Sequence, residues 1–319
     1  MAIQLLILVV GLALIVFGAD WLVDGASGIA RKAGISEFVI GLTIVGFGTS
    51  CPELVVSLTG AIAGKSDISA GNVIGSNIFN TLLILGLTAV ISPIAITHEN
   101  KRRDIPMTIA VTLLFILCGM SVSLFGLGEY DGISRIEGAL FLTLFVIYIY
   151  RCFKTGSAPG TNEAEEKQLR LGAAFALVAA GLAGLIIGGK FFVNSATEIA
   201  RMAGVSDKFI AVTILAGGTS LPELATCVVA AAKKKGQLAL GNILGSNVFN
   251  ILLVLGCSAV VHPLHFGHIN LVDAGVLMLS AILVFTSAYT GKKNMIDRMD
   301  GSIMLLCEAA YMTWLIINL

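Results

Sequence analysis

An internal repeat restricts the possible folds of this chain more than any other feature of its sequence. Residues 20–90 align with residues 190–260 at a constant offset of 170 and without a gap. The matched positions include polar residues and proline, for example Pro52-Glu53 and Pro222-Glu223. Two apolar segments of similar composition would share Leu and Ala by chance, but they would not share Asn, Ser, Thr, Pro and Glu in one register. The repeat therefore predicts two halves built on one plan.

The repeats lie in a strongly apolar chain. Of its 319 residues, 56% are hydrophobic and 13% are charged, whereas soluble domains contain about 25% charged residues. Positive and negative residues balance at 20 each, so the net charge does not indicate a nucleic-acid partner. A helix needs about 20 mostly apolar residues to cross a bilayer. The sequence predicts an all-α membrane protein with ten such spans, at 3–23, 36–62, 69–91, 105–125, 134–152, 170–193, 206–231, 239–261, 271–290 and 300–318.

The ten expected spans divide into two sets of five. A polar stretch at 154–169 predicts a linker between a first half, 1–153, and a second half, 170–319. The repeats occupy about 36–91 and 206–261. Because five is odd, the second half enters the membrane in the opposite orientation, and the halves become inverted repeats of the kind found in secondary transporters. The sequence contains no His-Glu-x-x-His motif, and an intramembrane enzyme is not expected.

The distribution of basic residues predicts the orientation. Of the 20 Lys and Arg residues, fifteen fall in the loops on the linker side, including Lys101–Arg103 and Lys233–Lys235. Basic loops stay in the cytoplasm. We therefore expect a cytoplasmic linker and both termini outside. The compact chain, without regulatory insertions, suggests by analogy a multi-pass protein of the cell (inner) membrane. Asp20 and Asp24 are expected at a solvated end of the first span.

Two polar motifs interrupt the apolar spans of each repeat. The segment Gly46–Glu53 reads Gly-Phe-Gly-Thr-Ser-Cys-Pro-Glu, and its counterpart ends at Glu223. Gly and Pro weaken helical hydrogen bonding, and a carboxylate at membrane depth is costly enough to indicate a functional site. Helices 2 and 7 are therefore expected to be broken. In the next span of each repeat, Asn and Ser recur at a spacing of four, which places them on one helix face; they are Asn72, Ser76 and Asn80, and Asn242, Ser246 and Asn250.

These motifs supply oxygen ligands: two Glu carboxylates, Asn amides, Ser and Thr hydroxyls, and backbone carbonyls near Gly46 and Ala216. His and thiolate, which zinc and copper prefer, are missing from both motifs apart from Cys51. Calcium takes six to eight oxygens, and two carboxylates neutralise one divalent cation. Sodium uses the same oxygens, and paired carboxylates can also take up protons. The residues thus predict cation transport, with calcium favoured and the counter-ion left open.

Two copies of Gly-Thr-Ser-x-Pro-Glu and Gly-Asn-x-x-Gly-Ser-Asn-x-x-Asn resemble the α-repeats of the sodium/calcium exchanger family, in the cation/calcium exchanger superfamily. The resemblance covers both repeats and the ten-span layout, and it is to the prokaryotic type. It implies an antiporter that exchanges Ca²⁺ for Na⁺ by alternating access, with spans 1 and 6 sliding across the core and without a cofactor. It also implies that Glu53 and Glu223 are the central calcium ligands. The further ion-lining residues that it implies are Thr49, Ser50, Ser76, Asn80, Thr219, Ser220, Ser246 and Asn250.

The chain departs from the family pattern at one position that bears on its ions. Some members carry Asp where this chain has Asn250, so only two carboxylates remain and the ion stoichiometry stays open. The proton-coupled branch usually has Glu at or near the position of Gly75 or Gly245, and Gly there favours sodium. An H⁺/Ca²⁺ antiporter of the same fold and a cation channel are the alternatives, and a fused inverted repeat argues against the channel. The expected partners are the ions and the lipid bilayer, without nucleic acid, and a monomer can suffice.

Overall fold

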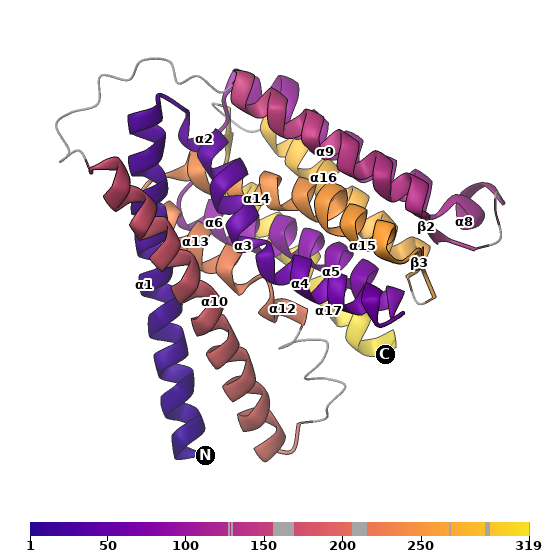
Figure 1. Ribbon diagram of the computed structural model, residues 1–319, viewed down its shortest axis with the longest axis horizontal. Helices are drawn as coiled ribbons and strands as arrows, with labels where there is room; N and C mark the ends of the chain where they lie inside the picture. Colours follow the sequence, from indigo (N-terminus) through magenta and orange to yellow (C-terminus); the bar gives the residue numbers. More distant parts are fainter. Residues whose placement is uncertain are drawn as a thin grey trace.

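The computed structural model describes residues 1–126, 128, 130–155, 169–205, 216–267, 269–290 and 294–318. Helices dominate this part of the chain (Figure 1). The elements of the first half are α1 Ala2–Ala33, α2 Glu37–Ile40, η1 Gly41–Val45, α3 Gly46–Thr49, α4 Cys51–Ile62, α5 Ser66–Phe79, η2 Asn80–Leu85, α6 Gly86–Ile91, β1 Ile94–Ala95, η3 Asn100–Asp104, α7 Ile105–Gly119, α8 Ser121–Phe125, β2 Gly132–Ile133 and α9 Arg135–Thr155, where η denotes a π-helical segment. Those of the second half are α10 Leu171–Met202, α12 Ala216–Gly218, α13 Leu221–Ala232, α14 Gly236–Phe249, η5 Asn250–Leu255, α15 Gly256–Val261, β3 Leu264–His265, α16 Leu271–Thr290, β4 Met295–Ile296 and α17 Arg298–Asn318.

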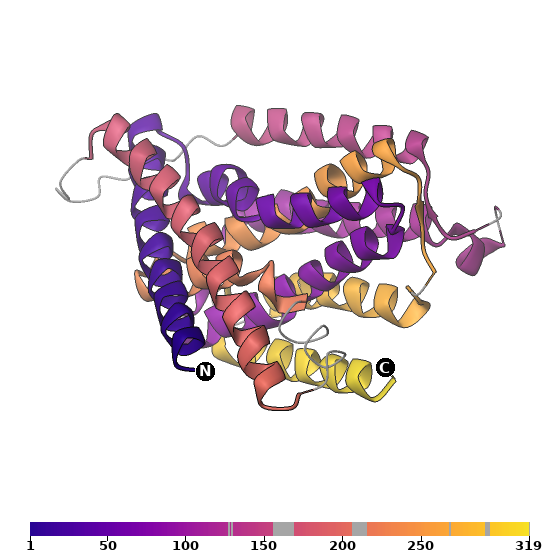
Figure 2. The ribbon, with the colours of Figure 1, turned by 60° about the horizontal axis from the view of Figure 1, so that its bottom comes forward.

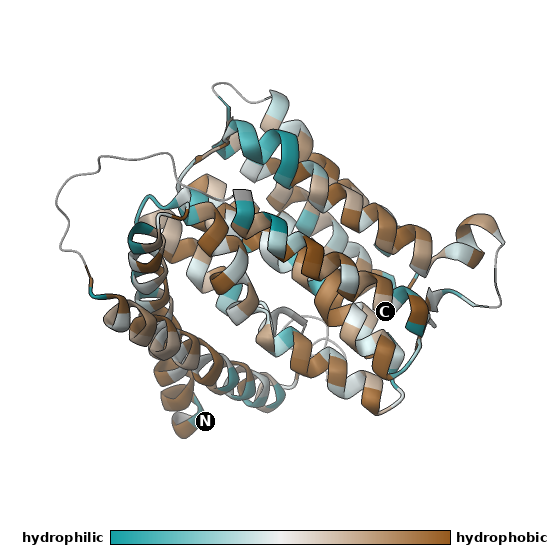
Figure 3. Cartoon of the chain, turned by 45° about the horizontal axis from the view of Figure 1, so that its top comes forward, coloured by the Kyte–Doolittle hydropathy of each residue, from teal (hydrophilic) through white to brown (hydrophobic). Residues whose placement is uncertain are grey.

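Seven helices or continuous helical runs of the described part are long and apolar enough to cross a membrane. An eighth span results if Glu37–Thr49 and Cys51–Ile62, which meet at a bend of 46°, are counted together. Figure 3 shows brown, the colour of hydrophobic residues, along stretches of the helices, as expected for a protein surrounded by lipid. The expected span 105–125 is divided into α7 and α8. Of the expected span 206–231, residues 206–215 lie outside the described residues, as does most of the linker, so the ten-span layout stays a prediction.

The helices α1 and α10 lie side by side along one side of the molecule in both Figure 1 and Figure 2. Glycines at intervals of seven let their backbones approach closely: Gly11, Gly18 and Gly25 in α1 face α10. A Cβ atom added at Gly18 would lie 2.8 Å from the carbonyl oxygen of Gly181. Because helices in lipid associate by close packing rather than by a hydrophobic driving force, these glycines hold the pair together.

The core repeats the same elements at the offset of 170. The series α5–η2–α6 recurs as α14–η5–α15 with identical lengths. The helix α14 is central, and its residues from Leu238 to Phe249 are all buried. Two short antiparallel pairs, β1 with β4 and β2 with β3, each join a strand of the first half to a strand of the second. The halves therefore interlock both in the core and at its ends.

Candidate functional site

The two glutamates occupy equivalent places at the starts of two helices. Glu53 lies in the first turn of α4 after Pro52, and Glu223 lies in the first turn of α13 after Pro222. Proline suits the first turn of a helix because its missing N–H has no partner there. The positive end of the helix dipole favours a carboxylate at the same place. The local sequence thus explains why each motif ends one helical segment and begins another.

The structure brings the two motifs together through crossed hydrogen bonds. The Ser50 hydroxyl donates to Oε1 of Glu223 at 3.1 Å, and the Ser220 hydroxyl donates to Oε1 of Glu53 at 3.2 Å. Both serines are the residues that precede α4 and α13, but neither caps its own helix. Both glutamates are completely buried. Each carboxylate is therefore positioned by a serine of the other half.

Two asparagines hold the neighbouring threonines. Thr49 donates to Oδ1 of Asn242 at 3.2 Å, and Thr219 donates to Oδ1 of Asn72 at 3.4 Å. Asn72 also donates to the Ser57 hydroxyl at 3.0 Å. Asn72 and Asn242 are not among the predicted ligands, and their contacts agree with a supporting role that links the two motifs.

Four further asparagines connect the two repeats at the centre. Asn80 donates to Oδ1 of Asn247 at 3.2 Å, and Asn250 donates to Oδ1 of Asn77 at 3.0 Å. Asn247 also donates to the hydroxyl of Thr81 at 2.8 Å. The sequence reasoning missed Asn77 and Asn247 as site residues, although both lie in the duplicated Gly-Ser-Asn motif. Because the amide nitrogens of Asn80 and Asn250 are used in this network, their amide oxygens are left for another partner.

Five of the predicted ligand residues have a buried oxygen atom that has no hydrogen-bond partner. These atoms are Oε2 of Glu53, Oε2 of Glu223, Oγ of Ser76, Oδ1 of Asn80 and Oδ1 of Asn250. A buried polar atom without a partner costs about 1–3 kcal/mol, and more when it is charged. Both halves contribute to the set. These oxygen atoms could coordinate a hard cation, which binds several oxygen ligands at once.

The remaining predicted positions lie around these atoms. The hydroxyl of Ser246 lies 3.5 Å from the carbonyl oxygen of Gly46, which is also 3.4 Å from the hydroxyl of Thr49. Ala216 begins α12, at the position that corresponds to Gly46 in the repeat. Within the described ranges no three His, Cys, Asp or Glu side chains group as a metal cluster. The donor set is therefore two carboxylates with neutral oxygens.

The two sides of the site differ in exposure. Thr49 and Asn242 are completely buried, whereas their counterparts Thr219 and Asn72 are only partly buried. On the buried side, α2 and η1 pack closely against α14, and the backbone of Phe38 leaves no room for a side chain at position 241. Packing of α2 and η1 thus closes the side of the site that contains Asn242.

One ion-pair cluster joins α1 to the core. The Nζ atom of Lys233, just after α13, lies 2.7 Å from a carboxylate oxygen of both Asp20 and Asp24. Partial burial alone would lower the pKa of Lys233, but its hydrogen bonds to the two aspartates outweigh this effect and raise the pKa. The aspartates, expected at a solvated end of the first span, are partly exposed but paired.

Comparison with known proteins agrees with the resemblance of the motifs. The model of a family described as sodium/calcium exchanger protein matches residues 3–154 and 173–317. The putative antiporter CaxA of Alkalimonas amylolytica is 40% identical, with 98% of both chains covered. The sodium/calcium exchanger MaX1 of Methanosarcina acetivorans is 32% identical, with 97% of both chains covered. A solved structure of the sodium-calcium exchanger NCX_Mj, soaked with sodium and without calcium, superposes with a TM-score of 0.84 at 33% identity and covers 98% of this chain and 99% of its own.

Proposed function

Because the chain belongs to the sodium/calcium exchanger protein family, we propose that it is a secondary antiporter that moves Ca²⁺ across the membrane in exchange for Na⁺. Membership of this family makes the chain a multi-pass membrane transporter rather than an enzyme. It also makes exchange of a cation against Ca²⁺ its general activity. The identity of the counter-ion and the roles of individual residues are the parts that we propose.

The five unpartnered oxygens carry the proposal. One Ca²⁺ between Glu53 and Glu223 would be neutralised by their two charges, which removes most of the cost of placing a divalent ion inside a membrane protein. Ser76, Asn80 and Asn250 supply neutral oxygens, and calcium accepts such mixed sets. Ser50 and Ser220 orient the carboxylates without using the oxygens that face the ion.

Sodium is proposed as the counter-ion because the same oxygens bind it and because the neutral part of the site has no further acid. Asn250 is an amide and cannot take up a proton as an aspartate could. Gly75 and Gly245 lack the carboxylate that the proton-coupled branch usually carries there. Sodium and calcium would then compete for the two carboxylates, which couples the movement of one ion to the return of the other.

Alternating access follows from the two halves, 1–153 and 170–319, if they are inverted repeats with broken helices 2 and 7 that exchange conformations. The closely packed α1–α10 pair is the unit that would slide across the core.

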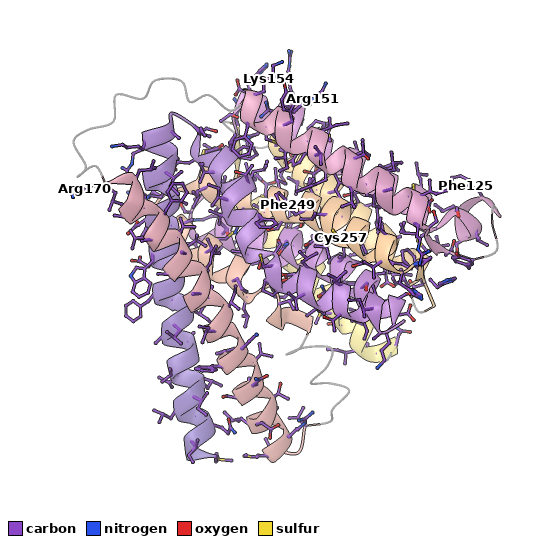
Figure 4. All side chains as sticks on the ribbon, viewed as in Figure 1. Phe125, Arg151, Lys154, Arg170, Phe249 and Cys257 are labelled. Atoms are coloured by element: carbon purple, nitrogen blue, oxygen red, sulfur yellow. The ribbon has the colours of Figure 1, made fainter. Side chains whose placement is uncertain are left out.

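The proposed orientation has the central linker in the cytoplasm and both termini outside, in a prokaryotic inner membrane. Figure 4 places Arg151 and Lys154 at one end of α9 and Phe125 beyond its other end. Arg151 and Lys154 flank the linker, and Arg31 and Lys32 lie in the last turn of α1. A concentration of basic residues beside the linker supports a cytoplasmic location for it.

Flux into liposomes tests the proposal. Vesicles that contain the purified protein are loaded with sodium, and uptake of radioactive calcium is measured. We expect uptake only with an outward sodium gradient, and loss of uptake in both E53Q and E223Q. Thr59→Ala is the matched control, because the Thr59 hydroxyl donates to a backbone carbonyl of its own helix. Equal uptake driven by a proton gradient without sodium would favour H⁺/Ca²⁺ exchange, and uptake without any counter-gradient would favour a channel.

A further inference from the structure

The last helix of each half packs on the core in the same register. A Cβ atom added at Gly301 of α17 would lie 2.5 Å from the Gly86 carbonyl oxygen, and one at Gly138 of α9 would lie 3.0 Å from the Gly256 carbonyl oxygen. One helical turn later, Leu305 approaches Gly86 and Leu142 approaches Gly256. Positions in α17 and α9 thus correspond at an offset of 163, while those in the core correspond at 170.

In this register, the position equivalent to Glu308 in the first half is occupied by an aromatic residue. The counterpart of Glu308 is Phe145, whose ring centroid lies 4.9 Å from that of Phe249 in an edge-on arrangement. Phe249 also approaches Phe47 at 5.8 Å, and Figure 4 labels Phe249 in the interior of the molecule. Three aromatic rings therefore pack in series on one side of the core.

On the other side the same three places are held by Gly217, Phe79 and Glu308. A Cβ atom at Gly217 would lie 3.6 Å from the Phe79 ring, so Gly217 and Phe79 are neighbours as Phe47 and Phe249 are. The carboxylate of Glu308 thus occupies the position at which the first half has the aromatic ring of Phe145.

The Glu308 carboxylate is buried, and no basic side chain among the described residues forms an ion pair with it. The residue is 4% exposed, and its Oε2 atom has no hydrogen-bond partner. The helical segments η2 and α6, which pack on α17, carry no titratable side chain. The helix α16 contributes Asp273, which accepts a hydrogen bond from Tyr311 at 2.9 Å. On α17 itself the basic residue is Arg298, ten positions and nearly three turns away, and the other titratable groups are Asp300, Cys307 and Tyr311.

An isolated carboxylate charge at this depth costs several kcal/mol, and such groups are paired or neutralised. We propose that Glu308 is a second intramembrane cation site, which binds one monovalent cation, either a proton or a sodium ion, where α17 packs on η2 and α6. A single carboxylate balances one positive charge, whereas a divalent ion would leave an excess. Glu308 belongs to α17, whereas Glu53 and Glu223 belong to α4 and α13, and the proposal does not depend on the direction or coupling of calcium transport.

A hydrophobic carbodiimide tests the proposal on the wild-type protein. Dicyclohexylcarbodiimide enters membranes and reacts with a protonated carboxylic acid: the acid O–H adds across one C=N bond, and the acyl group then moves to nitrogen, without a leaving group or a change of oxidation state. The purified protein is treated from mildly acidic to mildly alkaline pH, in sodium or in choline, and the adducts are located by mass spectrometry. E308Q identifies the Glu308 adduct, and Glu198, which is paired with Arg201 at the surface, reports reaction at an exposed carboxylate.

We expect an adduct on Glu308 that exceeds the adduct on Glu198 at least tenfold at neutral pH. If sodium is the bound ion, replacing choline by sodium at constant pH lowers the Glu308 adduct several-fold. If a proton is the bound ion, sodium has no effect and only alkaline pH lowers the adduct. Recovery of the Glu308 peptide without modification at every pH, or at no more than the level of Glu198, would overturn the proposal. None of these results depends on whether the vesicles transport calcium.

Discussion

The crossed hydrogen bonds of the site predict an energetic coupling that sequence distance alone would not suggest. Ser50 is three positions from Glu53, but its hydroxyl donates to Glu223 of the other half at 3.1 Å. In buffer without cations the buried carboxyl is expected to be neutral, and a neutral hydrogen bond contributes about 0.5–1.5 kcal/mol. Residues in direct contact show coupling energies of about 0.5–3 kcal/mol in double-mutant cycles. We therefore expect about 0.5–1.5 kcal/mol of coupling between Ser50→Ala and Glu223→Ala, which removes the acceptor, and less than about 0.5 kcal/mol between Ser50→Ala and Glu53→Ala.

The coupling is measured as the free energy of unfolding in mixed detergent micelles, in buffer without calcium and sodium, for the wild-type protein, the single variants and the double variants. The mirror cycle of Ser220 with Glu53 should give a similar value, because the two bonds differ by only 0.1 Å, from 3.1 to 3.2 Å. Thr59→Ala should not couple to either glutamate, since its hydroxyl bonds within its own helix. Coupling of Ser50 to Glu53 that equals or exceeds its coupling to Glu223 would refute the crossed arrangement.

Three further predictions concern contacts in other parts of the protein. Gly18→Ala should lower the free energy of unfolding by about 1–3 kcal/mol, because its Cβ would lie 2.8 Å from the backbone of α10. Gly189→Ala should be neutral or slightly stabilising, because an added Cβ there would have no neighbouring atom within 4 Å. Equal effects of the two substitutions would contradict the proposed packing. Lys233→Gln should cost about 0.2–1 kcal/mol for each of its two partly exposed ion pairs, and the loss should shrink at high salt. Slight burial would raise the pKa of Asp131, but hydrogen bonds outweigh it and lower the pKa. The ionised Asp131 carboxylate therefore stabilises the folded protein above its unfolded-state pKa near 4, and this stabilisation is lost as the pH falls through the lower pKa of the folded state. Asp131→Asn should be less stable than the wild type at neutral pH, and the difference in the free energy of unfolding should disappear in acid.

The repeat in the sequence contains much of what is needed to locate the site. A constant offset is enough to identify Glu53 with Glu223 and Ser76 with Ser246. Since equivalent residues of two interlocked halves must pack around one centre, the residues of the duplicated motifs come together. The Glu53 and Glu223 oxygens without partners are among those that the sequence singles out.

The pairing of individual side chains could not be obtained in the same way. Symmetry makes Ser50 and Ser220 equivalent, but whether each contacts the glutamate of its own motif or of the other depends on how closely α3 and α12 approach the opposite helices. The same applies to Asn77 and Asn247, whose amides cross between the halves. Glu308 lies outside the duplicated motifs, and only the packing of α17 on α6 relates it to Phe145.

The most direct test of the central claim is equilibrium binding of radioactive calcium to the purified protein across a range of sodium concentrations. The proposed exchange predicts one bound calcium per chain at the paired carboxylates, displaced by sodium and lost in both E53Q and E223Q, with Thr59→Ala unchanged. Calcium binding that survives in both glutamine variants, or that sodium does not displace, would contradict a shared calcium and sodium site between Glu53 and Glu223.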